Sequence, residues 1–221
     1  MSIEHQKQAT HEYSEERYER ILSTLGARGL IDASQQHEKN VLVAGKSYTL
    51  IGPYTRLDKG APVDVGSKSA IIIDFDNDKV LDDTYRRVLP ALERVSASNT
   101  RQEGLTALTS VIANRLLTYD AAAVVDLYRT DFSDTRPLVP HTLGEFIQNG
   151  TGICIQQALL VSALLEHAKD EELLPDTSLV SLESSHYKER GEVHAFTLFR
   201  IDDEGWRLDP TQSRAHRAEL V

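Results

Sequence analysis

Cys154 is the only cysteine of the chain, and it stands in a sequence context that can activate a thiol. It follows the stretch Gly150-Thr151-Gly152, and after it apolar residues recur every three or four positions, at Ala158, Val161, Leu165 and Ala168. This spacing predicts a helix that begins near the cysteine. Free N–H groups and the macrodipole at a helix N-terminus lower the pKa of a thiol. Cys154 is therefore a candidate nucleophile, with a buried structural cysteine as the alternative.

His194 lies in the segment EVHAFTLFRI, over 192–201, whose alternating side chains predict a β-strand. Fifteen residues later, the segment GWRLDP carries Asp209, and the stretch DDEG between them supplies turn residues for a hairpin. Such a hairpin would bring His194 and Asp209 together, but its register depends on the turn type and on any bulge. Taken singly, His194 could be an ordinary strand histidine and Asp209 a turn residue before Pro210.

Together, these three residue types suit nucleophilic catalysis by a thiol. A thiolate nucleophile needs a base that holds its proton and later delivers it to the leaving group. The base in turn needs a third group that fixes its tautomer. Cys154, His194 and Asp209 could supply these parts.

The order of these segments resembles the core of the transglutaminase-like superfamily, which is related to papain. The matching residues are Gly152, Cys154, His194, Ala195, Gly205, Trp206, Asp209, Pro210 and Thr211. The resemblance covers residues 140–215 and implies that Cys154 is the nucleophile, His194 the base and Asp209 the orienting acid. It also implies a fold in which the nucleophile begins a helix packed on an antiparallel sheet.

Departures from the family pattern bear on the reaction. Phe196 stands where many members have tryptophan, and no Pro-Ala-Arg stretch follows the cysteine helix. The only tryptophan, Trp206, belongs to the hairpin, so none remains to stabilise the oxyanion from an upstream loop as in the animal cross-linking enzymes. We therefore expect acyl transfer from an amide through a thioester, by a protease or deamidase rather than a transamidase.

Hydrogen-bond donors must meet the oxyanion that forms when the thiolate attacks, and the backbone N–H of Cys154 is the first candidate. Gln148 is a candidate for the second, because papain-like proteases place a glutamine at a similar offset before the cysteine. Gln157, one turn into the helix, is an alternative. Both glutamines could instead be ordinary polar helix residues.

The other segments are expected to support this catalytic core. The sequence predicts an amphipathic helix over 10–25, short β-type runs over 41–73, helices over 82–96, 102–117 and 120–128, and a loop over 130–141. Helix, glycine turn, long helix and strands follow from residue 142. We therefore expect an α+β protein, with a helical and β-rich N-terminal extension over 1–139 packed on a transglutaminase-like core over 140–221.

Composition argues against several other classes of protein. The net charge of −10 disfavours a nucleic acid as partner, because surfaces that bind phosphate backbones are basic. No run approaches the roughly 18 to 20 apolar residues that span a bilayer. The polar N-terminus lacks the features of a secretory signal, so we expect a cytoplasmic protein.

The motifs of metal and cofactor sites are incomplete. Asp74, Asp76 and Asp78 begin like a calcium loop, but Lys79 and Tyr85 occupy the places of its glycine and glutamate. His186 and His194 lack the spacing of zinc ligands. We expect no metal and no cofactor.

The expected partner is a protein or peptide substrate, with neither nucleic acid nor membrane involved. The competing hypothesis is a non-catalytic protein-binding or regulatory module that keeps the transglutaminase-like fold without turnover.

Overall fold

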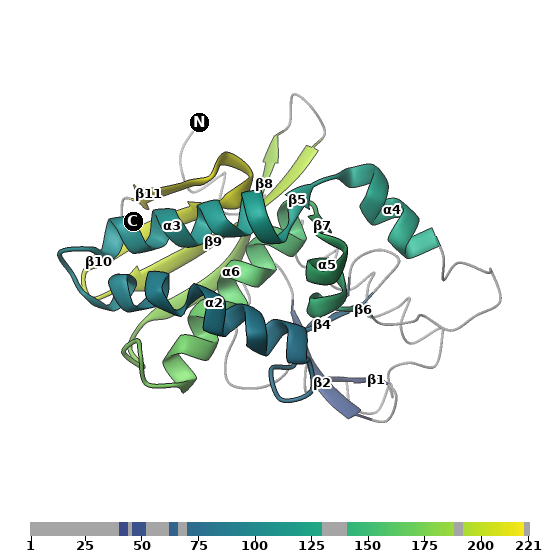
Figure 1. Cartoon of the computed structure of the whole chain (residues 1–221), viewed down its shortest axis with the longest axis horizontal. Coiled ribbons are helices and arrows are strands. Elements are labelled where there is room, and N and C mark those ends of the chain that lie inside the picture. The colour runs from purple at the N-terminus through teal and green to yellow at the C-terminus, as the bar shows by residue number, and fades with distance from the viewer. Residues whose placement is uncertain are drawn as a thin grey trace.

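A computed structural model of the protein describes residues 40–43, 46–51, 62–65, 70–129, 141–187 and 192–218. The helix expected over 10–25 and most of the loop expected over 130–141 lie outside these residues. The described residues form both helices and β-sheets, so the chain has the mixed α+β structure that the sequence predicts (Figure 1).

The candidate histidine and aspartate lie in a four-stranded antiparallel sheet with the strand order β11-β10-β9-β8. Its strands are β8 (Leu179–Tyr187), β9 (Glu192–Ile201), β10 (Glu204–Asp209) and β11 (Arg214–Ala218), with the 3-10 turn η3 (Pro210–Gln212) between the last two. The predicted strand over 192–201 is confirmed at both ends.

The remaining described strands form two further sheets. One has the order β1-β2-β3-β4-β6, and its strands are β1 (Asn40–Val43), β2 (Lys46–Ile51), β3 (Pro62–Val65), β4 (Ala70–Ile72) and β6 (His141–Thr142). The other consists of two short parallel strands, β5 (Thr118–Tyr119) and β7 (Thr151–Gly152). This second pair matters for the site because β7 leads directly into Cys154.

The helices follow the apolar periodicity of the sequence. They are α2 (Lys79–Ser96), α3 (Arg101–Val111) with its π-helical continuation η2 (Ile112–Leu116), α4 (Ala121–Arg129), α5 (Leu143–Asn149) and α6 (Cys154–Asp170). The helices predicted over 82–96, 102–117 and 120–128 are thus confirmed with small shifts at their ends.

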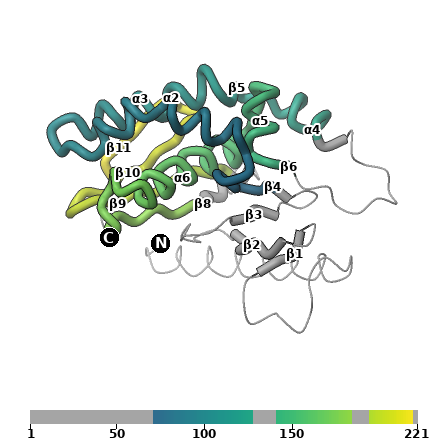
Figure 2. The backbone as a smooth tube through the Cα atoms, turned by 60° about the horizontal axis from the view of Figure 1, so that its bottom comes forward, coloured from purple at the N-terminus to yellow at the C-terminus, as the bar shows by residue number. Residues whose placement is uncertain are grey.

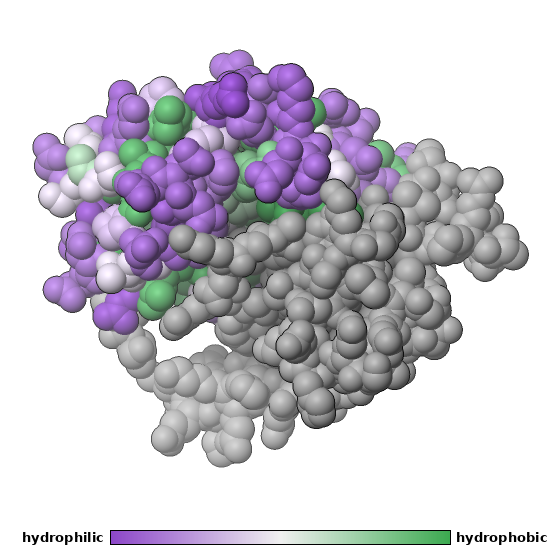
Figure 3. Space-filling view, turned by 90° about the horizontal axis from the view of Figure 1, so that it is seen from below, coloured by the Kyte–Doolittle hydropathy of each residue, from purple (hydrophilic) through white to green (hydrophobic). Residues whose placement is uncertain are grey.

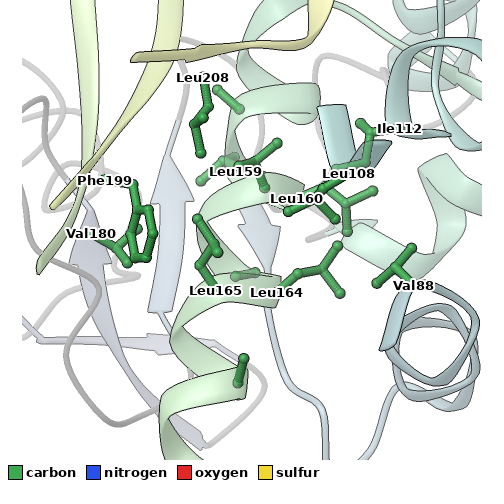
Figure 4. Close-up of a cluster of buried hydrophobic side chains, with 14 of the residues drawn as sticks. Val88, Leu108, Ile112, Leu159, Leu160, Leu164, Leu165, Val180, Phe199 and Leu208 are labelled. Atoms are coloured by element: carbon green, nitrogen blue, oxygen red, sulfur yellow. The ribbon is translucent and has the colours of Figure 1, made fainter. Parts of the chain in front are cut away.

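Helix α6 lies between the pair α2–α3 and the four-stranded sheet (Figures 1 and 2). Its residues are buried on nearly every side, as expected for a helix surrounded by other elements. The leucines of α6 meet side chains of α2, α3 and η2 on one side and of the sheet on the other (Figure 4). The labelled residues of this cluster are Val88, Leu108, Ile112, Leu159, Leu160, Leu164, Leu165, Val180, Phe199 and Leu208. Residues on both sides of position 140 therefore share one hydrophobic core.

Buried hydroxyl groups fix α6 on the sheet. Thr197 of β9 is fully buried, and its Oγ1 donates a hydrogen bond to the carbonyl oxygen of Ala158 at 3.0 Å. Ser162 Oγ lies 2.9 Å from the same Thr197 hydroxyl. These bonds set the position of α6 along β9, and hence the position of the cysteine at the helix start.

The described surface shown in Figure 3 is mostly hydrophilic, with small hydrophobic patches between hydrophilic residues. Within the part of the chain that the structure describes, no helix is both long enough and apolar enough to span a bilayer.

Candidate active site

Cys154 is the first residue of α6, as the sequence predicts. Ile153 before it has extended backbone, and its N–H donates to Gln156 Oε1 at 3.0 Å. A side chain that caps the N-terminus in this way fixes where the helix begins. The thiol therefore stands where the free N–H groups of the first turn favour a negative charge.

The turn that leads into Cys154 is held by backbone hydrogen bonds. Gly150 ends α5 with φ of +64°, a left-handed conformation that favours glycine. The carbonyl oxygens of Gly150 and Gly152 accept hydrogen bonds of 3.0 Å from the N–H groups of Thr118 and Asp120. The segment after η2 thus runs beside the glycine turn and restrains it.

The register of the β9–β10 hairpin places His194 and Asp209 on the same face of the sheet. Ile201 pairs with Glu204 around a two-residue turn, and Leu208 pairs with Thr197. Thr197 and Leu208 are fully buried against α6, so the residues that alternate with them point to the opposite face. We call this opposite face of β8–β11 the outer face, and it carries both His194 and Asp209.

Arg101, at the start of α3, holds the turn of this hairpin. Its Nη1 donates to Glu204 Oε2 at 2.8 Å and its Nη2 to Asp202 Oδ2 at 2.9 Å. Its Nε donates to the carbonyl oxygen of Val95 at 3.1 Å. The Arg101 side chain is only 4% exposed, so these acceptors compensate a buried guanidinium. We call this set of bonds the Arg101 clasp.

His194 and Asp209 make the contact that the hairpin was predicted to allow. His194 Nε2 lies 2.7 Å from Asp209 Oδ2, and Thr211 Oγ1 donates to Asp209 Oδ1 at 2.6 Å. Burial raises the pKa of Asp209, but the hydrogen bonds from His194 and Thr211 and the charges of His194 and Arg207 bring that pKa below its ordinary value. Asp209 is therefore a buried, ionised carboxylate that can orient the imidazole.

Cys154 hydrogen-bonds to the His194 side chain. Because Nε2 of the ring faces Asp209, Nδ1 is the nitrogen left for the sulfur. The hydrogen bonds with Asp209 and then with Cys154 outweigh burial and raise the pKa of His194 to about 10. The imidazole is thus held in its protonated form between two anionic partners.

The same contacts favour the thiolate form of Cys154. Burial raises the pKa of the thiol, but the hydrogen bond from His194 and the backbone N–H of Ala195 oppose burial, as do the His194 charge and the N–H of Ile155. Together these contacts lower the pKa below its ordinary value. The β9–β10 ladder ends at the pair Thr197–Leu208, which leaves the edge of β9 near Ala195 uncovered by β10. The site is therefore built for a thiolate–imidazolium pair.

The two glutamines considered for the oxyanion lie in different environments. Gln157 is buried, and its Nε2 donates to the carbonyl oxygen of Leu117 at 2.6 Å. Its Oε1 has no hydrogen-bond partner among the described residues. Gln148 is exposed near the end of α5. One side-chain N–H of Gln157 is thus already used in a hydrogen bond within the fold, whereas the Gln148 side chain lies at the surface.

Some residues of the site were not assigned a role from the sequence. Thr211 orients Asp209, and its position two residues after an aspartate was the available signal. Gln156 makes only one half of a capping box, and Ile153 at the N-cap lacks the hydroxyl of the usual Ser or Thr, so the sequence carried little signal for this cap. Arg101 carried no local signal, because its acceptors Asp202 and Glu204 lie about one hundred residues further along the chain.

Two of the three aspartates that resemble the start of a calcium loop, Asp74 and Asp78, accept hydrogen bonds around the start of α2. Asp78 Oδ1 accepts hydrogen bonds from the N–H groups of Val80 and Leu81, and its Oδ2 accepts the N–H of Gly144 at 2.8 Å. Asp74 accepts hydrogen bonds from Asn77. Nowhere in the described ranges do three histidine, cysteine or carboxylate side chains gather as metal ligands would.

The comparisons with known proteins found no relative of this chain. No protein-family model, no curated protein and no solved structure matches the chain.

Proposed function

We propose that the protein is a transglutaminase-like, cysteine-dependent acyl-transfer enzyme that acts on an amide. The observation that carries the proposal is the continuous set of hydrogen bonds from the Cys154 thiol through His194 to the buried Asp209. This arrangement suits a thiol nucleophile with an oriented base, and the lowered pKa of the thiol supplies the reactive thiolate.

In the first half-reaction, the Cys154 thiolate attacks the carbonyl carbon of the substrate. A new S–C bond forms and the negative charge moves to the carbonyl oxygen, where the backbone N–H of Cys154 can stabilise it. As the intermediate collapses, His194 gives its Nδ1 proton to the leaving amine and the C–N bond breaks. The products of this step are a thioester on Cys154, a free amine and a neutral imidazole.

In the second half-reaction, the neutral His194 takes a proton from water. The resulting hydroxide attacks the thioester carbon, the C–S bond breaks, and the acid product leaves a thiolate beside an imidazolium. An amine in place of water would give transamidation by the same steps. We favour water, because the chain's only tryptophan, Trp206, is buried within the core and the cross-linking family members use a tryptophan at the oxyanion.

Product analysis tests this proposal. The protein and its Cys154→Ala variant are incubated with a peptide library, with and without a primary amine, and the peptides are analysed by mass spectrometry. We expect cleavage or side-chain deamidation that requires Cys154, and no incorporation of the amine. Unchanged peptides, together with a Cys154 that alkylates no faster than a thiol in the unfolded chain, would instead favour a non-catalytic binding module.

A further inference from the structure

The outer face of the four-stranded sheet, which carries His194 and Asp209, also carries a group of basic side chains. The strand pairing puts Arg207 opposite His216 and Asp209 opposite Arg214, and directly paired residues point to the same face. Arg200 lies on this face at the far end of β9, six residues from His194. Arg200, Arg214 and His216 are exposed and Arg207 is one-third exposed. We call these four residues the basic patch.

The basic patch has little negative charge near it on its own face. Among the described side chains of the outer face, the carboxylates are Asp209, which is bonded to His194, and Glu183 on β8. Burial raises the pKa of Glu183 to about 7, against the opposing hydrogen bond from Ser181, so part of this residue is neutral at pH 7. On this face the described basic side chains therefore outnumber the described carboxylates, although the net charge of the chain is −10.

Arg207 places its positive charge beside Asp209, one of the proposed catalytic residues. Its guanidinium carbon lies 3.9 Å from the centroid of the Phe196 ring, and its Nη2 lies 3.7 Å from Asp209 Oδ2. Stacking on an aromatic ring uses the face of the guanidinium, which leaves the in-plane N–H groups able to meet a carboxylate. The ring thus holds a carboxylate-binding group in a fixed orientation beside the triad.

We propose that the basic patch binds an acidic segment of the peptide substrate, and that Arg207 determines specificity for a carboxylate close to the reacting amide. The inference rests on the proposed function, because it assigns the chemistry of the substrate of that same site. An acidic peptide fits because arginines pair with carboxylates through two parallel hydrogen bonds. The patch also lies on the same face of the sheet as His194, where the acyl group of the substrate would react.

A binding experiment tests this surface without relying on turnover. The Cys154→Ala variant is titrated with two rhodamine-labelled peptides of equal length, one rich in glutamate and one with glutamine at each of those positions. We expect the acidic peptide to bind about tenfold tighter in low salt, and the preference to shrink as salt is added. Arg207→Gln should remove most of the preference, and a variant with both Arg200→Glu and Arg214→Glu should reverse it.

A matched control separates the patch from the charge of the whole protein. Arg86 and Arg87 are both exposed on α2, so a control variant with both Arg86→Glu and Arg87→Glu changes the net charge by the same amount as the variant with Arg200→Glu and Arg214→Glu, at a site away from the outer face. We expect this control to keep the preference. The proposal is overturned if both peptides bind alike, if the outer-face variants leave the preference intact, or if the double α2 control removes it equally. A single-stranded RNA that binds as tightly as the acidic peptide would also overturn it.

A second measurement distinguishes failure of this inference from failure of the proposed function. The rate at which iodoacetamide alkylates Cys154 in the native chain reports the thiolate, because the thiolate is the form that reacts, and the neutral reagent is not attracted by the charge of the patch. A reactive Cys154 without any peptide preference would overturn the docking surface alone. An inert Cys154 with the preference intact would support the acidic docking surface and overturn the acyl-transfer function.

Discussion

Asp209 holds His194 from the neighbouring strand, with Nε2 of the imidazole 2.7 Å from Oδ2 of the carboxylate. The contact is diagonal across the hairpin, because the last pair of the ladder joins Thr197 to Leu208, and His194 lies three residues before Thr197 whereas Asp209 lies one residue after Leu208. Thr211 occupies the other carboxylate oxygen. Both oxygens of a buried carboxylate are thus satisfied, and the imidazole is left with Nδ1 for the sulfur.

We expect Asp209→Asn to keep the geometry of the site and to lower the rate of acyl transfer by Cys154. An amide stabilises the imidazolium less than a carboxylate does, so the rate of acyl transfer at neutral pH should fall about 10- to 100-fold. The measurement is kcat/KM for a peptide identified by product analysis. Thr211→Val, which leaves the charge in place, should have a much smaller effect, and equal losses in the two variants would contradict the role assigned to the carboxylate.

The same substitution should change the dependence of stability on pH. The pKa of Asp209 is lowered in the folded state, so its contribution to stability is present above its ordinary pKa of 3.8 and is lost as the pH falls through the folded value. The melting temperatures of wild type and Asp209→Asn should therefore differ at neutral pH and converge in acid. A difference that persists unchanged in acid would contradict this sign.

The Arg101 clasp should contribute measurably to stability. Arg101→Met leaves the Val95 carbonyl and the Glu204 carboxylate without their buried donor, so the free energy of unfolding should fall by about 2 to 4 kcal/mol. The control is Arg86→Met, which removes an exposed pair with Asp82 along α2 and should cost less than about 0.5 kcal/mol. Chemical denaturation measures both, and equal losses would contradict a special role for the clasp.

Local sequence patterns were sufficient for the elements that carry the triad. The spacing of apolar residues after Cys154 indicates a helix, and the alternation around His194 indicates a strand, because both patterns depend on neighbours a few residues apart. The hairpin contact depended on register, which the sequence left open. The two-residue turn at Asp202 and Asp203 settles it.

Long-range packing could not be predicted in the same way. Arg101 meets Asp202 and Glu204 only because α3 lies across the end of the hairpin, and no periodicity reports that placement. The sequence predicted a single apolar stripe on α6. The helix is buried on more sides than this, because the pair α2–α3 packs on one side and the four-stranded sheet on the other. Gln157 was expected to be either an oxyanion donor or an ordinary polar helix residue, and its hydrogen bond to the carbonyl of Leu117, forty residues earlier in the chain, had no local signal.

Two glycines should respond to substitution for different reasons. A Cβ at Gly104 would lie 2.7 Å from the backbone atoms Ala91 O and Val95 N of α2. Gly104→Ala must push α2 and α3 apart, and we expect a loss of about 2 to 4 kcal/mol. A Cβ at Gly150 would meet nothing within 4 Å, so Gly150→Ala should cost only the left-handed backbone, about 1 to 2 kcal/mol.

Thermal unfolding of the two variants separates these effects. The Gly104→Ala protein should be the less stable of the two, with a thiol that still reacts in the folded fraction. A Gly150→Ala protein that is as unstable as Gly104→Ala would contradict the view that this substitution costs stability only through the left-handed backbone of the turn before Cys154.

Gln148, exposed near the end of α5, and Gln157, buried on α6, stay the two candidates for the second oxyanion donor. If Gln148 supplies this donor, Gln148→Ala should lower kcat about 100-fold, because the transition-state charge would lose one donor. Alkylation of Cys154 by iodoacetamide forms no oxyanion, so its rate should stay the same. A change in kcat of less than about threefold would contradict this role. Gln157→Leu should instead cost about 1 to 3 kcal/mol of stability by leaving the Leu117 carbonyl unpaired.

The central claim is that His194 keeps Cys154 as a thiolate, and the pH profile of alkylation tests it most directly. The rate with iodoacetamide is measured from acid to alkaline pH for the wild type and for His194→Gln. For the wild type we expect a midpoint well below the ordinary thiol pKa of 9.0, with the ion pair persisting until His194 loses its proton near pH 10.

In His194→Gln, burial is no longer opposed by the imidazolium, so the midpoint should move upward and the rate near pH 7 should fall at least about tenfold. Circular dichroism confirms that the variant is folded. A wild-type midpoint at or above the ordinary value, or a midpoint that His194→Gln leaves unmoved, would contradict the account.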